Sequence, residues 1–378
     1  MHVTASYKPA YIYGGPIMSV SMLTEQLTVA GHSTDVFTTT ANGKKELDVE
    51  IQTPLLIDGV NVTFYERITK DHTHFSPALL SAIWRKAKEY DVIHIHAWWN
   101  LVSVLSCLLA IMQKVPVLVS PRGTLSNYSF NNRNHIVKAL IHQLLTKPLL
   151  KKCFIHTTSD YEYHAAQKLI NARGFFNIPN FIRLGQHNDT KVIETKCCLK
   201  LIFFSRIEEK KGLDMLLDAL IQVQVPFQLT IAGGGDNIYI NKLKAKAVEN
   251  KINDSIIWLG FQGENKFDLL FGHDVLVLPS YDENFGNVVI ESLSVGTAVL
   301  ISENVGLSTF VRENDIGWIC QTNPASIAKL INDIFVQGEK LVRIRHNAPT
   351  LIEHVFSNEQ LISEYITMYK KCLVPEKR

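Results

Sequence analysis

Short apolar runs rich in β-branched residues alternate with longer segments of helical periodicity along the whole chain. In the first half we expect strands at HVTAS, TDVFTTT, DVIHIHA, PVLVSPRG and CFIHTTS, and helices at GPIMSVSMLTEQLTVAGH and HFSPALLSAIWRKAKEY. In the second half we expect strands at KLIFFSR, FQLTIAGGG, IIWLGF, DVLVLPS and TAVLIS, separated by helices such as GLDMLLDALIQV. Continuous apolar strands that alternate with helices indicate α/β structure with parallel sheets covered on both faces.

Two successive sets of strands predict two doubly wound, Rossmann-like domains, and the length of 378 residues agrees with this. The join is expected within residues 176–196, so the first domain would comprise residues 1–180 and the second residues 181–357. On its own pattern, the last helix, from about residue 358, is compatible with either domain.

The composition is that of an ordinary soluble globular protein, with 46% hydrophobic and 20% charged residues. A formal net charge of +2 gives no general attraction to nucleic acid. The six cysteines show neither CxxC spacing nor paired histidines, which argues against a disulfide framework or a zinc site. The N-terminus lacks a signal-peptide pattern, and the longest apolar run, LVSVLSCLLAIM, is shorter than the ~20 residues that span a bilayer. We therefore expect a cytoplasmic protein.

One long segment, residues 92–159, contains no Asp or Glu but several Lys and Arg residues. Such a segment is typical of a surface that meets phosphate groups or acidic lipids, unless acids from elsewhere in the fold neutralise it. Within it, residues 133–152 combine an apolar stripe with basic positions. This pattern fits peripheral contact with an anionic membrane, but packing onto the sheet explains the same apolar stripe and is the favoured interpretation.

Chemically distinctive residues follow the expected strands, where doubly wound sheets bind their ligands. They are Gly14, Gly15, His96, Trp98 and Arg122 in the first half, and Arg206, Gly234 and Glu283 in the second. A glycine turn that opens a helix can bind phosphate through backbone N–H groups, although glycine pairs occur in many turns. The GGGD stretch lacks the full GxGxxG spacing, which disfavours a nicotinamide oxidoreductase.

Two cations and two carboxylates stand out in the second half. Arg206 and Lys211 meet at a strand–helix junction and suit a leaving pyrophosphate; surface ion pairs with the neighbouring glutamates explain them equally well. Glu283 precedes a helix and Glu291 lies in its second turn. Carboxylates accept hydrogen bonds from sugar and ribose hydroxyls, and the helix start between them offers N–H groups to a phosphate.

With these segments in this order, the chain resembles the GT-B glycosyltransferases of the large retaining family four over nearly its whole length. The resemblance rests on YGGPIMSVSMLTEQLTVAGHSTDVFTT, DVIHIHAWW, SPRGTL, TTSDYEYHAA, IPNFI, SRIEEKKGLDMLLDAL, IAGGGD, IIWLGF and LPSYDENFGNVVIESLSVGTAVLIS. It implies two domains that face each other across a cleft, with the last helix, residues 358–378, crossing back onto the first domain.

The resemblance also implies roles for individual residues. Glu283 would contact the donor sugar, Glu291 the ribose, and Arg206 with Lys211 the diphosphate, so that neither a metal nor another cofactor is expected. Further donor contacts would come from Gly14, Gly15, Gly234, Phe261, Phe285, Gly286, Asn287 and Val288.

The acceptor side departs from the family pattern. Arg122 stands where many relatives have a histidine, and arginine cannot act as a general base because it stays protonated. It could instead hold an acceptor phosphate or stabilise the leaving group. His96 is assigned to the acceptor side with it, and Trp98 either stacks on acceptor sugars or belongs to the core.

The implied function is retaining transfer of a hexosyl unit from a UDP- or GDP-sugar to a hydroxyl of a glycan or lipid-linked oligosaccharide. Bacterial capsule, O-antigen or exopolysaccharide synthesis is the expected setting. The alternatives are a non-catalytic subunit of a transferase complex, and a sugar phosphorylase or epimerase on the same fold.

Overall fold

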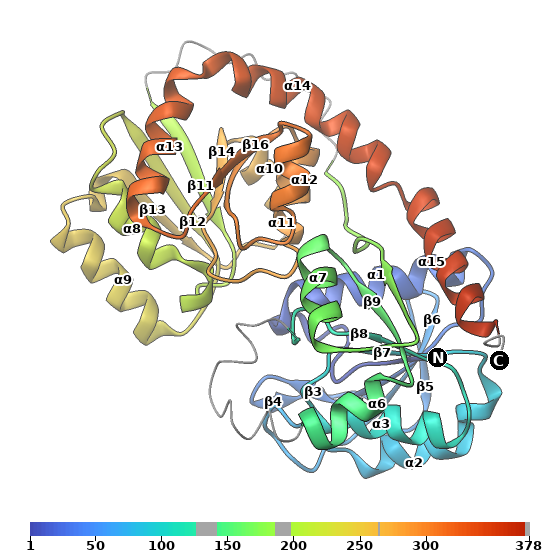
Figure 1. Cartoon of the computed structure of the whole chain (residues 1–378). Coiled ribbons are helices and arrows are strands. Elements are labelled where there is room, and N and C mark those ends of the chain that lie inside the picture. Colours follow the sequence, from blue (N-terminus) through green and yellow to red (C-terminus); the bar gives the residue numbers. More distant parts are fainter. Residues whose placement is uncertain (126–141, 186–197, 264, 375–378) are drawn as a thin grey trace. The chain divides into compact units, whose positions relative to one another are not determined.

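The structure is a computed structural model that describes residues 1–125, 142–185, 198–263 and 265–374 (Figure 1). The chain divides into two compact units, Met1–Phe181 with Asn358–Arg378, and Ile182–Ser357. The boundary expected from the sequence lies one residue away from this division. The last helix, whose pattern alone fitted either domain, belongs to the first unit.

The first unit contains an eight-stranded sheet with the order β10-β9-β8-β7-β1-β2-β6-β5. Its strands are β1 (His2–Val3), β2 (Asp35–Thr39), β5 (Pro54–Ile57), β6 (Val60–Tyr65), β7 (Ile93–His96), β8 (Val117–Ser120), β9 (Phe154–Thr157) and β10 (Gly174–Asn177). A separate two-stranded ribbon joins β3 (Ala41–Asn42) and β4 (Lys45–Glu46).

One edge of this sheet departs from the expected parallel arrangement, because β5 and β6 form an antiparallel hairpin. Asp58 and Gly59 connect the strands with φ angles of 49° and 82°, and Ile57 pairs with Val60. A two-residue Asp-Gly loop with both φ angles positive matches the right-handed twist of paired strands. The Asp-Gly signal is present in the sequence, but our strand assignment passed over it.

Helices cover both faces of the sheet. They are α1 (Gly15–Val29), α2 (Pro77–Lys86), α3 (Leu101–Met112), α6 (Lys147–Leu150), α7 (Asp160–Leu169) and α15 (Asn358–Leu373), with short helical turns η1 (Tyr11–Tyr13), η2 (Ala87–Glu89) and η3 (His142–Thr146). Alternate strand residues face opposite sides. Ile93 and Ile95 pack in one core cluster with residues of α2 and α3, whereas Leu118 packs in another with residues of α1 and α15.

The second unit is an all-parallel sheet of six strands in the order β13-β12-β11-β14-β15-β16. The strands are β11 (Leu199–Phe204), β12 (Phe227–Ala232), β13 (Ile256–Gly260), β14 (Val275–Leu278), β15 (Ala298–Ser302) and β16 (Gly317–Cys320). The helices are α8 (Leu213–Leu220), α9 (Asn237–Glu249), α10 (Lys266–Phe271), α11 (Asn287–Ser294), α12 (Ser308–Glu313), α13 (Pro324–Val336) and α14 (Gly338–Val355), with turns η4 (Glu209–Lys211) and η5 (Asn253–Ser255).

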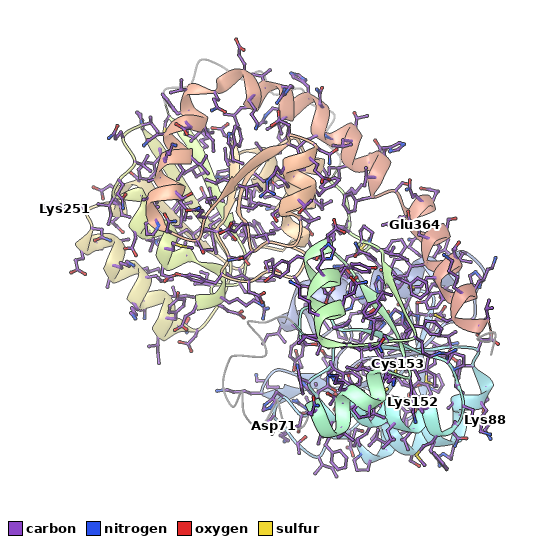
Figure 2. All side chains as sticks on the ribbon, viewed as in Figure 1. Asp71, Lys88, Lys152, Cys153, Lys251 and Glu364 are labelled. Carbon is purple, nitrogen blue, oxygen red and sulfur yellow. The ribbon has the colours of Figure 1, made fainter. Side chains whose placement is uncertain are left out.

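Side chains fill the space between helices and sheet in this unit (Figure 2), and the buried apolar ones form one core cluster. Helix α8 packs against α9 and α13, and α11 packs against α10 and α14. The expected doubly wound α/β architecture is therefore confirmed in both units.

Among the parallel strands of each sheet, the order reverses at one point. In the second unit this point lies between β11 and β14, and in the first it lies between β1 and β7. Doubly wound sheets bind ligands beyond the carboxyl ends of the strands at this point. The residues after these strands are therefore the ones that define a site.

No helix in the described part of the chain is long and apolar enough to cross a membrane. The basic segment expected to contact a membrane or the sheet, residues 133–152, lies partly outside the described residues.

Candidate active site

The strand-order reversal of the second unit carries an ion pair between Lys211 and Glu283. Lys211 ends η4, directly after β11, and Glu283 lies in the loop after β14. The side chains are only 10% and 18% exposed. The Glu283 N–H donates to the Asn304 carbonyl at 3.0 Å, and the Glu283 carbonyl accepts from the Gly306 N–H at 2.8 Å. The backbone around the carboxylate is thus held from both sides.

Gly212 explains why the two loops meet. Its φ of +71° is a left-handed conformation, and a Cβ atom at this position would lie 2.3 Å from the Pro279 carbonyl oxygen. Only glycine allows the turn after β11 to approach the loop after β14 so closely. The sequence Lys211-Gly212 therefore places the ammonium group beside Glu283.

Further charges surround this pair. Lys210 forms an ion pair with the buried Asp282 at 2.8 Å. Arg206 forms an ion pair with Glu208 at 2.8 Å, and the side chains of Arg206 and Glu208 are both exposed. Burial raises the pKa of Glu283, but Lys211 outweighs it, with help from Lys210 and Arg206, and holds that pKa below its ordinary value of 4.5. Glu283 is therefore an ionised hydrogen-bond acceptor at neutral pH. Arg206 thus forms the surface ion pair with Glu208 that the sequence allowed, whereas Lys211 pairs with Glu283.

Gly286 opens α11 with a φ of +93° and no side-chain cap. A Cβ atom there would lie 3.2 Å from Val305 Cγ1 and 3.3 Å from Val289 Cγ2, so glycine suits both the conformation and the space. Asn287 and Val288, the first residues of the helix, are half-buried. Binding of a phosphate by the N–H groups at the start of α11 stays a prediction.

Glu291 is buried on α11, and its Oε1 lies 2.5 Å from Lys266 Nζ at the start of α10. Our sequence interpretation missed Lys266, because a pair separated by 25 residues becomes visible only in the folded chain. As a result, both glutamates of the motif are paired with a lysine.

The other predicted donor-binding residues of this unit differ in how far their side chains are exposed. Phe261, after β13, is 76% exposed, whereas Phe285 is buried against Phe356, so that only its backbone is available to a ligand. Gly234 is half-buried, and its carbonyl accepts from the Ile207 N–H at 2.8 Å.

The rest of the triple glycine serves backbone packing. Cβ atoms on Gly233 and Gly235 would lie 1.8 and 2.2 Å from the carbonyl oxygens of Ser205 and Ile207. The run therefore lets the chain after β12 pack against the chain after β11, which is a structural need independent of phosphate.

In the first unit, polar side chains line the sheet face opposite α2 and α3. They are His2, His94, His96, Ser120 and His156, at alternate positions of β1, β7, β8 and β9. All four histidines are buried, and burial is the largest cause that lowers the pKa of each, to about 3 for His156. They are therefore neutral at physiological pH.

The hydrogen bonds of these neutral rings have a definite direction. His156 Nε2 must donate to the Ile178 carbonyl at 2.9 Å, so its Nδ1 accepts from Ser120 Oγ at 2.6 Å. Ser120 then accepts from His94 Nε2 at 2.6 Å, and His94 Nδ1 accepts from the Tyr369 hydroxyl of α15 at 2.8 Å. One chain of hydrogen bonds thus runs from the last helix to the end of β10.

A second chain begins at Arg122. Its Nε donates to His96 Nδ1 at 3.3 Å, so His96 Nε2 donates to His2 Nδ1 at 2.9 Å. Arg122 Nη1 also donates to Asn180 Oδ1 at 2.8 Å. Of the predicted acceptor-side residues, Arg122 and His96 are therefore in direct contact. Our sequence interpretation missed the other histidines, although alternate histidines in an otherwise apolar strand were the visible signal.

Trp98 requires a correction. Its ring has no exposed surface and packs in the core of the first unit, so it is not placed to stack on an acceptor sugar. The neighbouring Trp99 donates from Nε1 to the Thr124 carbonyl at 2.6 Å and fixes the turn that carries Arg122. Gly14 has a φ of 69° and Gly15 begins α1, but their predicted contact with the donor remains a prediction.

Within the described ranges, the side chains of His2, His94 and His96 form the one group that could hold a metal ion. Both ring nitrogens of His94 already hydrogen-bond to Tyr369 and Ser120. The geometry therefore favours a hydrogen-bond network over a metal site.

Comparison with known proteins identifies the class. The model of Glycosyltransferase Family 4 matches residues 13–184, and that of Glycosyl transferases group 1 matches residues 194–351. An uncharacterized glycosyltransferase of Methanocaldococcus jannaschii is 27% identical over 97% of both chains. Sucrose-phosphate synthase from Thermosynechococcus elongatus superposes with a TM-score of 0.75 over 98% of both chains at 18% identity. HepE of Anabaena, solved with UDP and glucose, gives 0.72 over 98% of this chain and 100% of its own at 16% identity.

The two doubly wound units and these matches define a glycosyltransferase enzyme of the GT-B class. Within that class, the chain belongs to the group 1, family 4 glycosyltransferases.

The Lys211–Glu283 pair predicts a pH-dependent stability. Because the pKa of Glu283 is lowered in the folded protein, the ionised carboxylate favours folding above its ordinary pKa, and this contribution is lost as the pH falls through the lowered value. In Lys211→Met the carboxylate stays buried without its ammonium partner, so we expect a loss of about 3–5 kcal/mol in the free energy of unfolding near neutral pH. The loss should shrink in acid, where the carboxyl takes up a proton.

Urea unfolding followed by tryptophan fluorescence at several pH values measures this effect. Lys246→Met is the matched control, because Lys246 pairs at 2.6 Å with the more exposed Asp218 of the same unit. It should change the free energy by less than about 1 kcal/mol. Equal effects of the two substitutions at all pH values would show that Lys211 does not hold Glu283 ionised.

Proposed function

We propose that the second unit binds a nucleoside diphosphate sugar and that the enzyme transfers its hexosyl unit, with retention of configuration, to a hydroxyl group. The observation that carries this proposal is the buried Lys211–Glu283 pair at the strand-order reversal. It combines a cation suited to a diphosphate with an ionised carboxylate suited to sugar hydroxyls. The UDP and glucose bound to HepE of Anabaena support the choice of ligand class.

Exchange of ion-pair partners explains how the site would accept so much negative charge. Lys211, Lys266 and Arg206 each pair with a carboxylate, Glu283, Glu291 and Glu208 respectively. A diphosphate offers these cations stronger, charge-assisted partners. As the lysines turn toward the phosphates, Glu283 and Glu291 gain free oxygens for the sugar and the ribose. Binding of the two ends of the donor is thereby coupled.

The chemical step is a front-side displacement. The acceptor oxygen bonds to the anomeric carbon while the bond from that carbon to the β-phosphate oxygen breaks, and the acceptor proton passes to the leaving phosphate. Lys211 and Arg206 stabilise the charge that develops there. Glu283 stays ionised, because its lowered pKa prevents it from acting as a proton donor at neutral pH. Proton NMR of the glycoside product should show the anomeric configuration of the donor at the newly formed linkage, and an inverted product would contradict this step.

A metal ion is not needed in this scheme, because protein cations meet the diphosphate. Turnover should accordingly be the same in excess EDTA and in added Mn²⁺ or Mg²⁺. Activity that disappears on chelation and returns with a divalent ion would refute this part of the proposal.

The acceptor is proposed to be a glycan or a lipid-linked oligosaccharide of bacterial capsule, O-antigen or exopolysaccharide synthesis. The basic residues of the segment 92–159 support an acceptor that carries phosphate or lies at an anionic membrane.

Substitution of Glu283 and of Glu291 should affect kcat and donor affinity differently. Glu283→Gln removes the charge beside the reacting sugar, so we expect kcat to fall by about 10²-fold or more with a modest effect on donor affinity. Glu291→Gln weakens one charged hydrogen bond to the ribose, so the donor Kd should rise by about tenfold with less effect on kcat.

A panel of UDP- and GDP-sugars, screened by thermal shift, selects the donor, and calorimetry with steady-state kinetics then separates Kd from kcat. Glu249→Gln, an exposed glutamate at the end of α9, is the matched control and should behave as the wild type. Unchanged turnover in Glu283→Gln would overturn the assignment of the site.

A further inference from the structure

Arg122 of the first unit carries a positive charge that its hydrogen-bond partners in the described residues do not balance. Its two hydrogen-bond acceptors are neutral, the imidazole of His96 and the side-chain oxygen of Asn180. Its Nη2 atom is buried and lacks a hydrogen-bond partner within the described ranges. Burying a charged donor without a hydrogen-bond partner costs far more free energy than burying a neutral donor. A protein therefore retains such a group where a ligand supplies the missing partner.

The nearest carboxylate does not complete it. Glu162 of α7 raises the pKa of Arg122 from a distance, while burial, the larger effect, lowers it. Both oxygens of Glu162 accept from backbone N–H groups, of Gly123 at 2.6 Å and of Thr158 at 2.9 Å. Glu162 therefore anchors the turn around Arg122 and does not ion-pair with the guanidinium.

The other titratable side chains described near the guanidinium do not supply a negative charge. His2, His96 and His156 are buried, and Arg122 contributes to lowering the pKa of each of them. Tyr365 and Tyr369 of α15 lie on the same side, and burial raises the pKa of each. Among the residues that the structure describes, every titratable neighbour named here except Glu162 is thus neutral at physiological pH, which leaves the positive charge available to an anion.

The backbone fixes where this charge is presented. Arg122 and Gly123 both have positive φ angles, 51° and 80°, directly after β8. The turn is held by Glu162 at Gly123 and by Trp99 at Thr124. Left-handed backbone at a residue other than glycine is uncommon and is kept where the surroundings demand it. The guanidinium is therefore preorganised at the carboxyl edge of the sheet, where this class of sheet binds ligands.

We propose that Arg122, oriented by His96 and Asn180, binds a phosphate group of the acceptor substrate. The inference rests on the proposed transferase function only in assigning the phosphate to the acceptor; the anion site itself is a property of the first unit. The Nη2 group, which is buried in the ligand-free structure, donates to one phosphate oxygen when the half-buried residue adjusts to admit the ligand. The phosphate supplies a negative charge that the described residues around Arg122 do not pair with it, and it positions the acceptor hydroxyl through the sugar attached to it.

Titration of the intact, ¹⁵N-histidine-labelled protein with inorganic phosphate tests this inference. Saturating UDP is present to occupy the donor site, and sodium chloride keeps the ionic strength constant. The ring signals of His96, assigned with a His96→Gln variant, should shift saturably, because its Nδ1 accepts from Arg122. His273 of the second unit serves as an internal reference, since its ring bonds to Thr230 and to the Leu269 carbonyl.

Three variants complete the design. Phosphate affinity should fall by about tenfold or more in Arg122→Gln and by less in Arg122→Lys, which keeps the charge but loses the guanidinium fork. Arg85→Gln, an exposed arginine of α2, should bind phosphate as the wild type does. The same titration with glucose 1-phosphate and with an octyl diphosphate then distinguishes a soluble sugar phosphate from a lipid-linked diphosphate as the source.

Two results would overturn the inference. One is the lack of a saturable His96 shift in the wild type, which does not depend on any variant folding. The other is equal phosphate affinity in the wild type and in a folded Arg122 variant. UDP binding, measured separately by calorimetry, tests the donor site of the second unit. Failure of the phosphate titration with normal UDP binding would therefore remove this inference and leave the proposed function standing.

Discussion

The close approach of Gly212 to the Pro279 carbonyl is the constraint on which the candidate active site depends. It brings the turn after β11 onto the loop after β14 at the point where the strand order of the second unit reverses. Lys211 and Glu283 meet because of that approach, and the largely buried Glu283 stays ionised because Lys211 lies beside it. A larger residue at position 212 would separate the loops, and with them the cation from the carboxylate. Backbone packing thus sets the electrostatics of the site.

The two units share the doubly wound α/β architecture but differ in the electrostatics of their strand ends. In the second unit, lysines and an arginine are matched by carboxylates, which suits a site where charged partners exchange. In the first, neutral histidines surround one arginine, and hydrogen bonds rather than ion pairs fix the geometry. Helix α15 completes this network: Tyr369 contacts His94, while Tyr365 donates to the Pro179 carbonyl and stacks on Phe181. The end of the chain is therefore tied to the segment that leaves the first unit.

Much of this organisation could be predicted from the sequence, for local reasons. Apolar strands followed by glycine or charge marked the strand ends, and the spacing of Glu283 and Glu291 placed both around one helix start. What escaped prediction depends on contacts between distant segments. Lys266 reaches Glu291 only through the packing of α10 on α11, and His94 meets Ser120 and Tyr369 only through sheet register and the docking of α15. Trp98 follows a strand like its polar neighbours, and nothing local distinguished a core ring from a binding ring. The β5–β6 hairpin is different, because the Asp58-Gly59 dipeptide is a local hairpin signal that the sequence already contains, and our interpretation did not use it.

The central claim is that the cations of the second unit leave their carboxylates to bind a diphosphate. A crystal structure with a hydrolysis-resistant nucleoside diphosphate sugar tests it most directly. We expect Lys211 Nζ within hydrogen-bonding distance of the β-phosphate, Glu283 on the sugar hydroxyls, and Glu291 on the ribose. A nucleotide bound away from the strand-order reversal, with the Lys211–Glu283 and Lys266–Glu291 pairs unchanged, would contradict it.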